Sequence, residues 1–111
     1  MRVTKSNINQ FIEGSSMDCS NKGITHIEYI PDGIKRLYCH SNRLTELPKL
    51  PESLIGLYCD NNKLTELPKL PESLEYLTCQ YNNLPYKITI DNLKQHNKLI
   101  KRKQILSRIC G

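Results

Sequence analysis

The chain has 111 residues, a formal net charge of +5 and no Trp. This length limits it to one domain, and no run of residues approaches the ~20 apolar side chains of a membrane-spanning helix. The N-terminal sequence is too polar for the core of a signal peptide, so we expect an intracellular, cytoplasmic protein whose five cysteines form no disulfide framework.

Residues 1–13 are expected to form an N-terminal helical cap. Ser6 can cap the start of a helix and Gly14 can end it. The apolar side chains that recur at helical spacing are Val3, Ile8, Phe11 and Ile12. Such a cap would cover the open apolar end of the repeats that follow.

Residues 14–85 contain four tandem repeats of about 20 residues each. The sequence IKRLYCHSNRLTELPKLPES of residues 34–53 returns almost unchanged as LIGLYCDNNKLTELPKLPES in residues 54–73. A further copy starts at Leu74, and a degraded one occupies residues 14–33. The shared pattern is LxxLxCxxNxLxxLPxLPxx. A unit this short cannot bury its apolar side chains alone, so the repeats are expected to stack.

Each repeat is expected to contain a short strand followed by an extended return. Side chains alternate along a strand, so Leu37 and Cys39 would point inward while Tyr38 points outward. Stacked strands form a parallel sheet with two inward columns: Met17, Leu37, Leu57 and Leu77, and Cys19, Cys39, Cys59 and Cys79. Prolines in the returns, such as Pro48 and Pro51, fix φ and remove donors, which favours a polyproline II convex side.

Cysteine and asparagine recur at positions that suit a structural ladder. A row of buried thiols behaves as small hydrophobes, whereas a zinc site would use close pairs such as CxxC, which the sequence lacks. A buried amide at the turn after each strand can bond to the backbone of its own and the adjacent repeat, and these residues are Asn42, Asn62 and Asn82. Lys22 takes this place in the first repeat, with Asn21 one residue early, so we expect a looser or solvent-facing first turn.

Residues 86–111 differ in composition and form a basic C-terminal cap or tail. From residue 85 onward seven basic side chains accompany one acidic, a net charge of +6, whereas residues 1–84 have a net charge of −1. A helix that starts at Thr89 or Asp91 and runs to about Arg108 is expected. Its apolar residues do not form one stripe, so its first turns should cap the repeats while its end stays partly exposed.

The repeat pattern resembles the leucine-rich repeat, and in particular the short form with two prolines found in secreted bacterial effectors. This resemblance implies an α/β fold: a right-handed solenoid with a short parallel sheet on its concave face, an extended convex side and helical caps. It also implies that the asparagines serve the turns. Abundant Lys, Asn and Ile with no Ala make the chain look like leucine-rich repeat proteins of giant DNA viruses, which would place it in a host cell.

The outward side chains of the strands are the candidate binding site. Here repeats that are otherwise alike differ, and Tyr and Arg are enriched in binding hot spots. The candidate residues on the concave face are Arg36, Tyr38, His40, Tyr58, Asp60 and Tyr76. We hypothesise a non-catalytic module that recognises a partner protein. The alternative is an ordinary solvated sheet face on which Tyr is simply a good strand former.

Two further functions are open at this stage. The basic tail could bind a polyanion, either nucleic acid or an anionic membrane surface, and the block Lys101 to Lys103 could act as a nuclear address. The alternative for the tail is a solvated helix that keeps the cap soluble. The repeats could also be the substrate-recognition adaptor of a ubiquitin ligase supplied by the host.

Catalysis, metals and cofactors are not expected. Cys39 and His40 are neighbours in a strand and so face opposite sides, which prevents them from forming a nucleophile and base pair. No HExxH, paired-carboxylate or phosphate-loop pattern occurs. The sequence therefore favours a binding protein over an enzyme.

Overall fold

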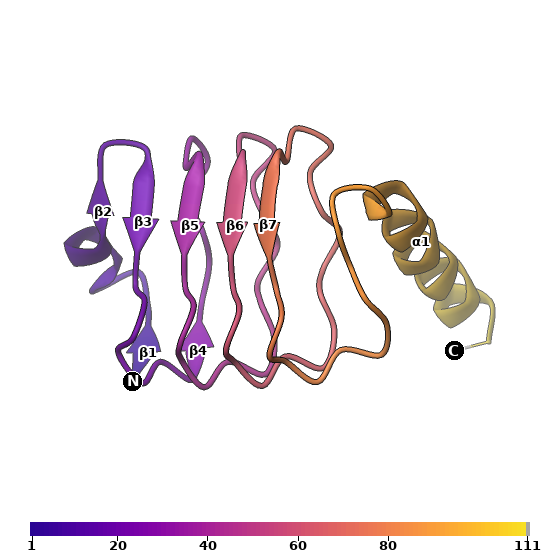
Figure 1. Cartoon of the computed structure of the whole chain (residues 1–111), viewed down its shortest axis with the longest axis horizontal. Helices are drawn as coiled ribbons and strands as arrows, with labels where there is room; N and C mark the ends of the chain where they lie inside the picture. Colours follow the sequence, from indigo (N-terminus) through magenta and orange to yellow (C-terminus); the bar gives the residue numbers. More distant parts are fainter. Residues whose placement is uncertain (111) are drawn as a thin grey trace.

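The computed structural model describes the backbone of residues 1–110 and the side chains of residues 1–106. The main sheet consists of β2 (Ile12–Glu13), β3 (Ser16–Asp18), β5 (Arg36–Tyr38), β6 (Gly56–Tyr58) and β7 (Tyr76–Thr78), in that order. A second sheet pairs β1 (Arg2–Val3) with β4 (His26–Ile27), and helix α1 spans Leu93–Cys110. Figure 1 shows β3, β5, β6 and β7 side by side, with α1 beyond β7. The fold is α/β.

Strands β3, β5, β6 and β7 are parallel and share one register. Leu57 pairs with Leu37 on one side and with Leu77 on the other, so equivalent residues of neighbouring repeats stand side by side. Between residues 12 and 92 the described chain contains no helix, and the returns run back in extended form behind the sheet (Figure 1). This agrees with the expectation that the prolines exclude helices from the returns.

The N-terminal segment differs from the predicted helical cap. Its only helical turn is the 3-10 helix η1 (Ile8–Phe11), whose N-cap is Asn7 rather than Ser6. The reason is tertiary pairing, because β1 pairs in parallel with β4 and β2 pairs in antiparallel fashion with β3. Backbone groups that a helix would have used are therefore engaged in sheets. The side chains of Val3, Ile8 and Phe11 are nevertheless buried.

The turns after β3, β5 and β6 are each held by an asparagine of the following repeat. Asn42 Oδ1 accepts hydrogen bonds from the backbone N of Lys22 (3.0 Å) and of Ile24 (2.9 Å), and Asn42 Nδ2 donates to Cys19 O at 2.9 Å. The expected looseness of the first turn is therefore not observed, whereas its expected exposure to solvent is, since Asn21, Lys22 and Gly23 are exposed. An asparagine in the first repeat would have no preceding repeat to hold, although Asn42, Asn62 and Asn82 also bond within their own turns.

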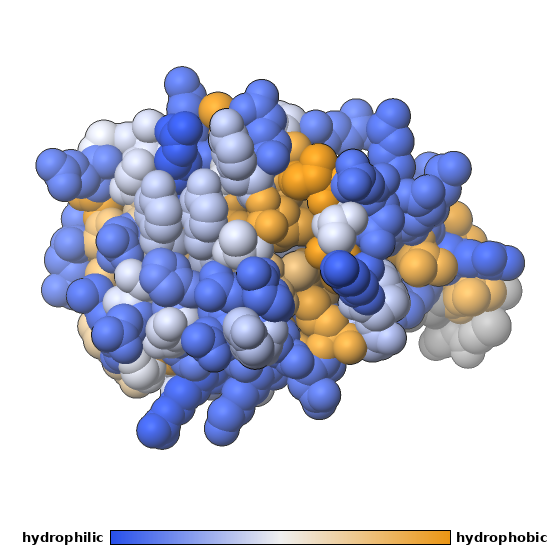
Figure 2. Space-filling model, viewed as in Figure 1, coloured by the Kyte–Doolittle hydropathy of each residue, from blue (hydrophilic) through white to orange (hydrophobic). Residues whose placement is uncertain are grey.

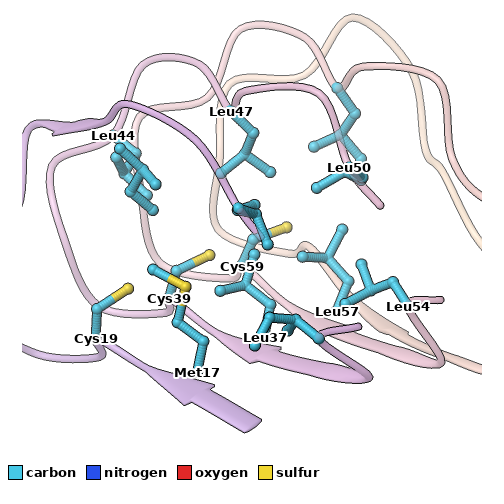
Figure 3. Packing of buried hydrophobic residues seen from close by; sticks show 14 of the residues in the cluster. Met17, Cys19, Leu37, Cys39, Leu44, Leu47, Leu50, Leu54, Leu57 and Cys59 are labelled. Carbon is cyan, nitrogen blue, oxygen red and sulfur yellow. The ribbon is translucent and has the colours of Figure 1, made fainter. Parts of the chain in front are cut away.

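The core lies between the sheet and the returns (Figure 3). Met17, Leu37 and Leu57 of the inward strand column are fully buried, as are return residues such as Leu44 and Leu64. Burying a side chain of this kind stabilises the fold by roughly 1.5–3 kcal/mol. The last member of the column, Leu77, is only partly buried, because no strand follows β7.

Helix α1 is attached to the third return by its first turns. Leu93 and His96 are buried, and His96 Nε2 lies 2.9 Å from the carbonyl oxygen of Pro68. Asn97 binds Leu70 twice, since its Oδ1 accepts from the backbone N and its Nδ2 donates to the carbonyl oxygen, both at 2.7 Å. No helix in the described part of the chain has the length and apolar character needed to cross a membrane.

Candidate functional site

The outward side chains of β3, β5, β6 and β7 form one surface, which we call the sheet face. The register brings its residues into rows across the strands: Ser16, Arg36, Gly56 and Tyr76, then Asp18, Tyr38, Tyr58 and Thr78. Beyond the strand ends, Cys39 N donates to Tyr58 O at 2.9 Å and Ser41 N donates to Asp60 O at 3.0 Å. His40 and Asp60 are thus in adjacent strand extensions, where both are half-buried.

Tyr38 and Tyr58 form a stacked pair at the centre of the sheet face. Their ring centroids are 4.8 Å apart and their planes differ by 5°. This distance matches the ~4.8 Å spacing of neighbouring strands, so the stack follows directly from the sheet register. Both rings are half-buried, which leaves part of each available to a ligand.

Gly56 provides the space into which Tyr58 leans. A Cβ atom at Gly56 would lie 3.0 Å from Tyr58 Cε2 and 3.2 Å from Tyr58 Oη, closer than side-chain carbons normally approach. The positions equivalent to Gly56 on the neighbouring strands β5 and β7 hold the larger residues Arg36 and Tyr76. The glycine therefore allows the Tyr58 ring to lie across the neighbouring position of its own strand.

Two carboxylates occupy polar positions on the sheet face. Asp60 Oδ1 accepts a hydrogen bond of 2.8 Å from Thr78 Oγ1. Asp18 Oδ1 accepts from the backbone N and the hydroxyl of Ser20 at 3.1 and 2.6 Å, and these bonds, with smaller contributions from His40 and Lys22, lower the pKa of Asp18. Asp18 thus stays ionised at neutral pH.

The predicted site residues share one face, but their surroundings differ. Arg36 and Tyr76 are exposed, with Tyr76 at 53%, and the described aromatic contacts of the face join Tyr38 and Tyr58 alone. Sequence reasoning did not find the role of Gly56 or the Thr78 to Asp60 bond. It also missed a hollow of about 520 Å³ beside Tyr38. One wall of this hollow is the N-terminal segment, for which the sequence predicted a helix instead of the observed strands. This wall consists of Gln10, Phe11, Ile12 and Glu13.

The four thiols of the repeats lie in a row inside the core, on the opposite side of the sheet from the tyrosines. Cys19, Cys39 and Cys59 are fully buried and Cys79 nearly so, and all four are free. Burial raises the pKa of Cys19 to about 12 and raises that of Cys39 well above its usual value. At neutral pH these thiols are protonated and are not nucleophiles.

No cluster of three His, Cys, Asp or Glu side chains able to hold a metal ion occurs among the described residues. Asn62 and Asn82 repeat the bonds of Asn42, for each Nδ2 donates at 3.0 Å to a cysteine carbonyl of the preceding repeat. The thiols and the amides of the repeats thus serve packing and turn geometry.

Comparison with known proteins identifies the class. No family model and no curated protein matches the chain. A solved structure of YopM from Yersinia enterocolitica WA-314 is similar, with a TM-score of 0.60 and 39% sequence identity over 60% of this chain. The chain is a leucine-rich repeat protein. The match spans only 15% of the YopM chain.

Proposed function

We propose that this leucine-rich repeat protein is a non-catalytic binding module that recognises a partner protein through the sheet face. The residues that would contact the partner are Arg36, Tyr38, His40, Tyr58, Asp60 and Tyr76. The observation that carries the proposal is the stack of Tyr38 on Tyr58, 4.8 Å apart and nearly parallel. Leucine-rich repeats commonly act as protein-interaction modules, which supports the class of function.

The stacked pair is suited to binding because it is already ordered. Each ring is confined by its neighbour, and Tyr58 is also confined by the backbone at Gly56. Ordering a free side chain on binding costs about 0.5–1.5 kcal/mol, and a preformed pair avoids much of this cost. Tyrosine also offers apolar area with a hydroxyl group, which explains its enrichment in hot spots.

Charged groups around the tyrosines would supply selectivity. Arg36 is exposed on one side of the pair, and Asp60, fixed by Thr78, lies on the other. Charges at the rim of an interface chiefly govern the association rate and the choice of partner, while central aromatic residues supply affinity. A partner with an apolar centre and charges of both signs at its edge would fit this arrangement.

The test has two stages. Affinity capture from the native cell, analysed by mass spectrometry, would provide a partner, whose affinity is then measured with purified protein. The double variant Tyr38→Ala/Tyr58→Ala should weaken binding by about thirtyfold or more, the effect expected for hot-spot residues. Tyr81→Ala is the matched control, since Tyr81 is 76% exposed in the turn that follows β7, outside the rows of the sheet face, and it should bind normally.

The proposal fails if the folded double variant keeps the affinity of the wild type. A narrower form is that the module serves as the substrate-recognition adaptor of a host ubiquitin ligase. Recovery of ligase subunits together with a substrate would support that form, and their absence from a saturating capture would oppose it.

A further inference from the structure

Helix α1 presents apolar side chains to solvent on the side that faces away from the repeats. Leu99, Ile105 and Leu106 are 41%, 45% and 51% exposed. With 3.6 residues per turn, Leu99 and Leu106 lie on one side of the helix, roughly 120–140° around its axis from the docked residue Leu93. Figure 2 shows hydrophobic and hydrophilic side chains interleaved on the part of the surface that α1 forms.

The same stretch is strongly basic. Between residues 93 and 106 the helix contains five basic side chains and no acidic one, and the basic residues are Lys94, Lys98, Lys101, Arg102 and Lys103. Asp91 lies just before the helix, and three carboxylates approach it from the returns, where Glu72 lines one hollow with α1 and Glu46 and Glu66 line another. Lys49 and Lys69 line these hollows as well, so six basic groups and three acidic ones line them, and Arg102 is a further basic group on the helix.

Arg102 lines neither hollow and lies between Leu99 and Leu106 along the outward side of α1. A surface with both exposed leucines and excess positive charge matches an anionic lipid bilayer, whose headgroups are negative and whose acyl region accepts apolar side chains. From this charge complementarity and the exposed apolar residues we infer that α1 docks the protein on an anionic membrane surface, lying in the plane of the interface.

Nucleic acid fits this face less well. Phosphate groups would pair with the basic side chains but would leave Leu99, Ile105 and Leu106 in water. The aromatic ring within residues 93–106 is the imidazole of His96, which is buried and so offers no surface on which a base could stack. A helix docked on a membrane would leave the sheet face free, because α1 lies beyond β7 at the end of the repeats (Figure 1). Membrane binding therefore does not depend on the proposed protein-binding function.

Co-sedimentation of the full-length protein with vesicles tests the inference. The vesicles contain phosphatidylcholine alone or with about one quarter phosphatidylserine, a content that gives a negative surface potential. The wild type should bind only the anionic vesicles. Lys98→Gln/Arg102→Gln should weaken binding by about tenfold or more, since each basic residue near the surface contributes substantially. Arg43→Gln/Lys63→Gln removes the same charge from exposed positions in the turns and should bind like the wild type.

The variant Leu99→Gln/Leu106→Gln separates membrane docking from simple charge attraction. Both leucines are exposed, so the fold should persist, which circular dichroism checks. Its vesicle binding should fall by about tenfold or more because two apolar groups no longer enter the interface. The inference is overturned if this variant binds vesicles normally, or if the wild type ignores anionic vesicles. It is also overturned if, at physiological salt, labelled duplex DNA or single-stranded RNA is bound and the vesicles are not.

Discussion

The side-chain amide of Asn62 donates a hydrogen bond of 3.0 Å to the carbonyl oxygen of Cys39 in the preceding repeat. The same nitrogen donates to Cys59 O at 3.1 Å, and Asn62 Oδ1 accepts from the backbone N of Leu44 at 3.0 Å. All of these groups are buried, so water cannot replace the amide. One side chain thus joins two repeats at the point where the chain leaves the strand.

Removing this amide should destabilise the stack. Asn62→Ala is expected to lower the free energy of unfolding by about 1–3 kcal/mol, because buried backbone groups lose their partners. Urea denaturation followed by circular dichroism measures the change. Asn83→Ala, at an exposed position in the next repeat, is the matched control and should stay within about 0.5 kcal/mol of the wild type. An equal decrease in the free energy of unfolding in Asn62→Ala and Asn83→Ala would contradict the role of Asn62 in joining the two repeats.

The inward leucine column should show a gradient of stability along the array. Leu57→Ala removes a fully buried side chain that lies between Leu37 and Leu77, and should cost about 2–5 kcal/mol. Leu77→Ala should cost less, because Leu77 is partly exposed at the open end of the sheet. Urea midpoints at one temperature compare the two variants. A larger loss for Leu77→Ala would mean that the last repeat is more tightly packed than its burial indicates.

The repetitive part of the fold follows from the sequence, since one offset between copies fixes every column. Once Leu37 is matched to Leu57, the pairing of Tyr38 with Tyr58 and the row of thiols follow without further information. The N-terminal segment does not repeat, and its two-residue strands form only because β4 and β3 are there to pair with them. Helical spacing of a few apolar residues cannot reveal such pairing.

The sequence was sufficient to predict which residues of the candidate site share one face of the sheet. The parallel stack of the two tyrosines over Gly56 was not, because it depends on ring orientation, which alternation along a strand does not specify. The docking of α1 through His96 and Asn97 was also hidden. It rests on one contact of His96 with Pro68 and two hydrogen bonds between Asn97 and Leu70, and isolated polar residues in a helix give no signal of such partners.

The buried thiols should make stability depend on pH under alkaline conditions. Burial raises the pKa of Cys19 from 9.0 to about 12 and also raises that of Cys39. At a pH between the unfolded and the folded pKa of a thiol, that thiol is ionised in the unfolded chain but still protonated in the folded chain. Ionisation of the thiol therefore favours unfolding. The stabilisation that the buried, protonated thiol gives to the folded state is fully present below the unfolded pKa of 9.0. It is lost as the pH rises toward the pKa of the thiol in the folded state. Each such thiol accounts for up to ~1.4 kcal/mol per pH unit.

Replacing one thiol should make this dependence shallower. The free energy of unfolding of Cys39→Ala, measured in urea at several pH values from neutral to alkaline, should fall less steeply than that of the wild type. Thr65→Ala, an exposed change that removes no ionisable group, should leave the slope unchanged. Parallel curves for Cys39→Ala and the wild type would show that the Cys39 thiol does not remain protonated in the folded state.

Gly56→Ala should disturb the tyrosine stack while leaving the sheet intact. The added methyl group would lie 3.0 Å from Tyr58 Cε2, so the ring has to move, and its contact with Tyr38 at 4.8 Å changes with it. The backbone can remain in place, because the obstructing atoms belong to the end of a side chain. Near-ultraviolet circular dichroism reports the environment of the tyrosines without interference, since the chain has no Trp.

Arg36→Ala is the matched control for this variant, because it occupies the same row on the adjacent strand. It should leave the tyrosine signal close to that of the wild type, whereas Gly56→Ala should alter it with little change in the far-ultraviolet spectrum. Proton NMR would resolve the two rings separately, since the ring current of each stacked tyrosine shifts the proton resonances of the other. Unchanged Tyr38 and Tyr58 resonances in Gly56→Ala would show that the stack does not depend on the glycine. The preorganisation argued for the sheet face would then have to come from the strand register alone.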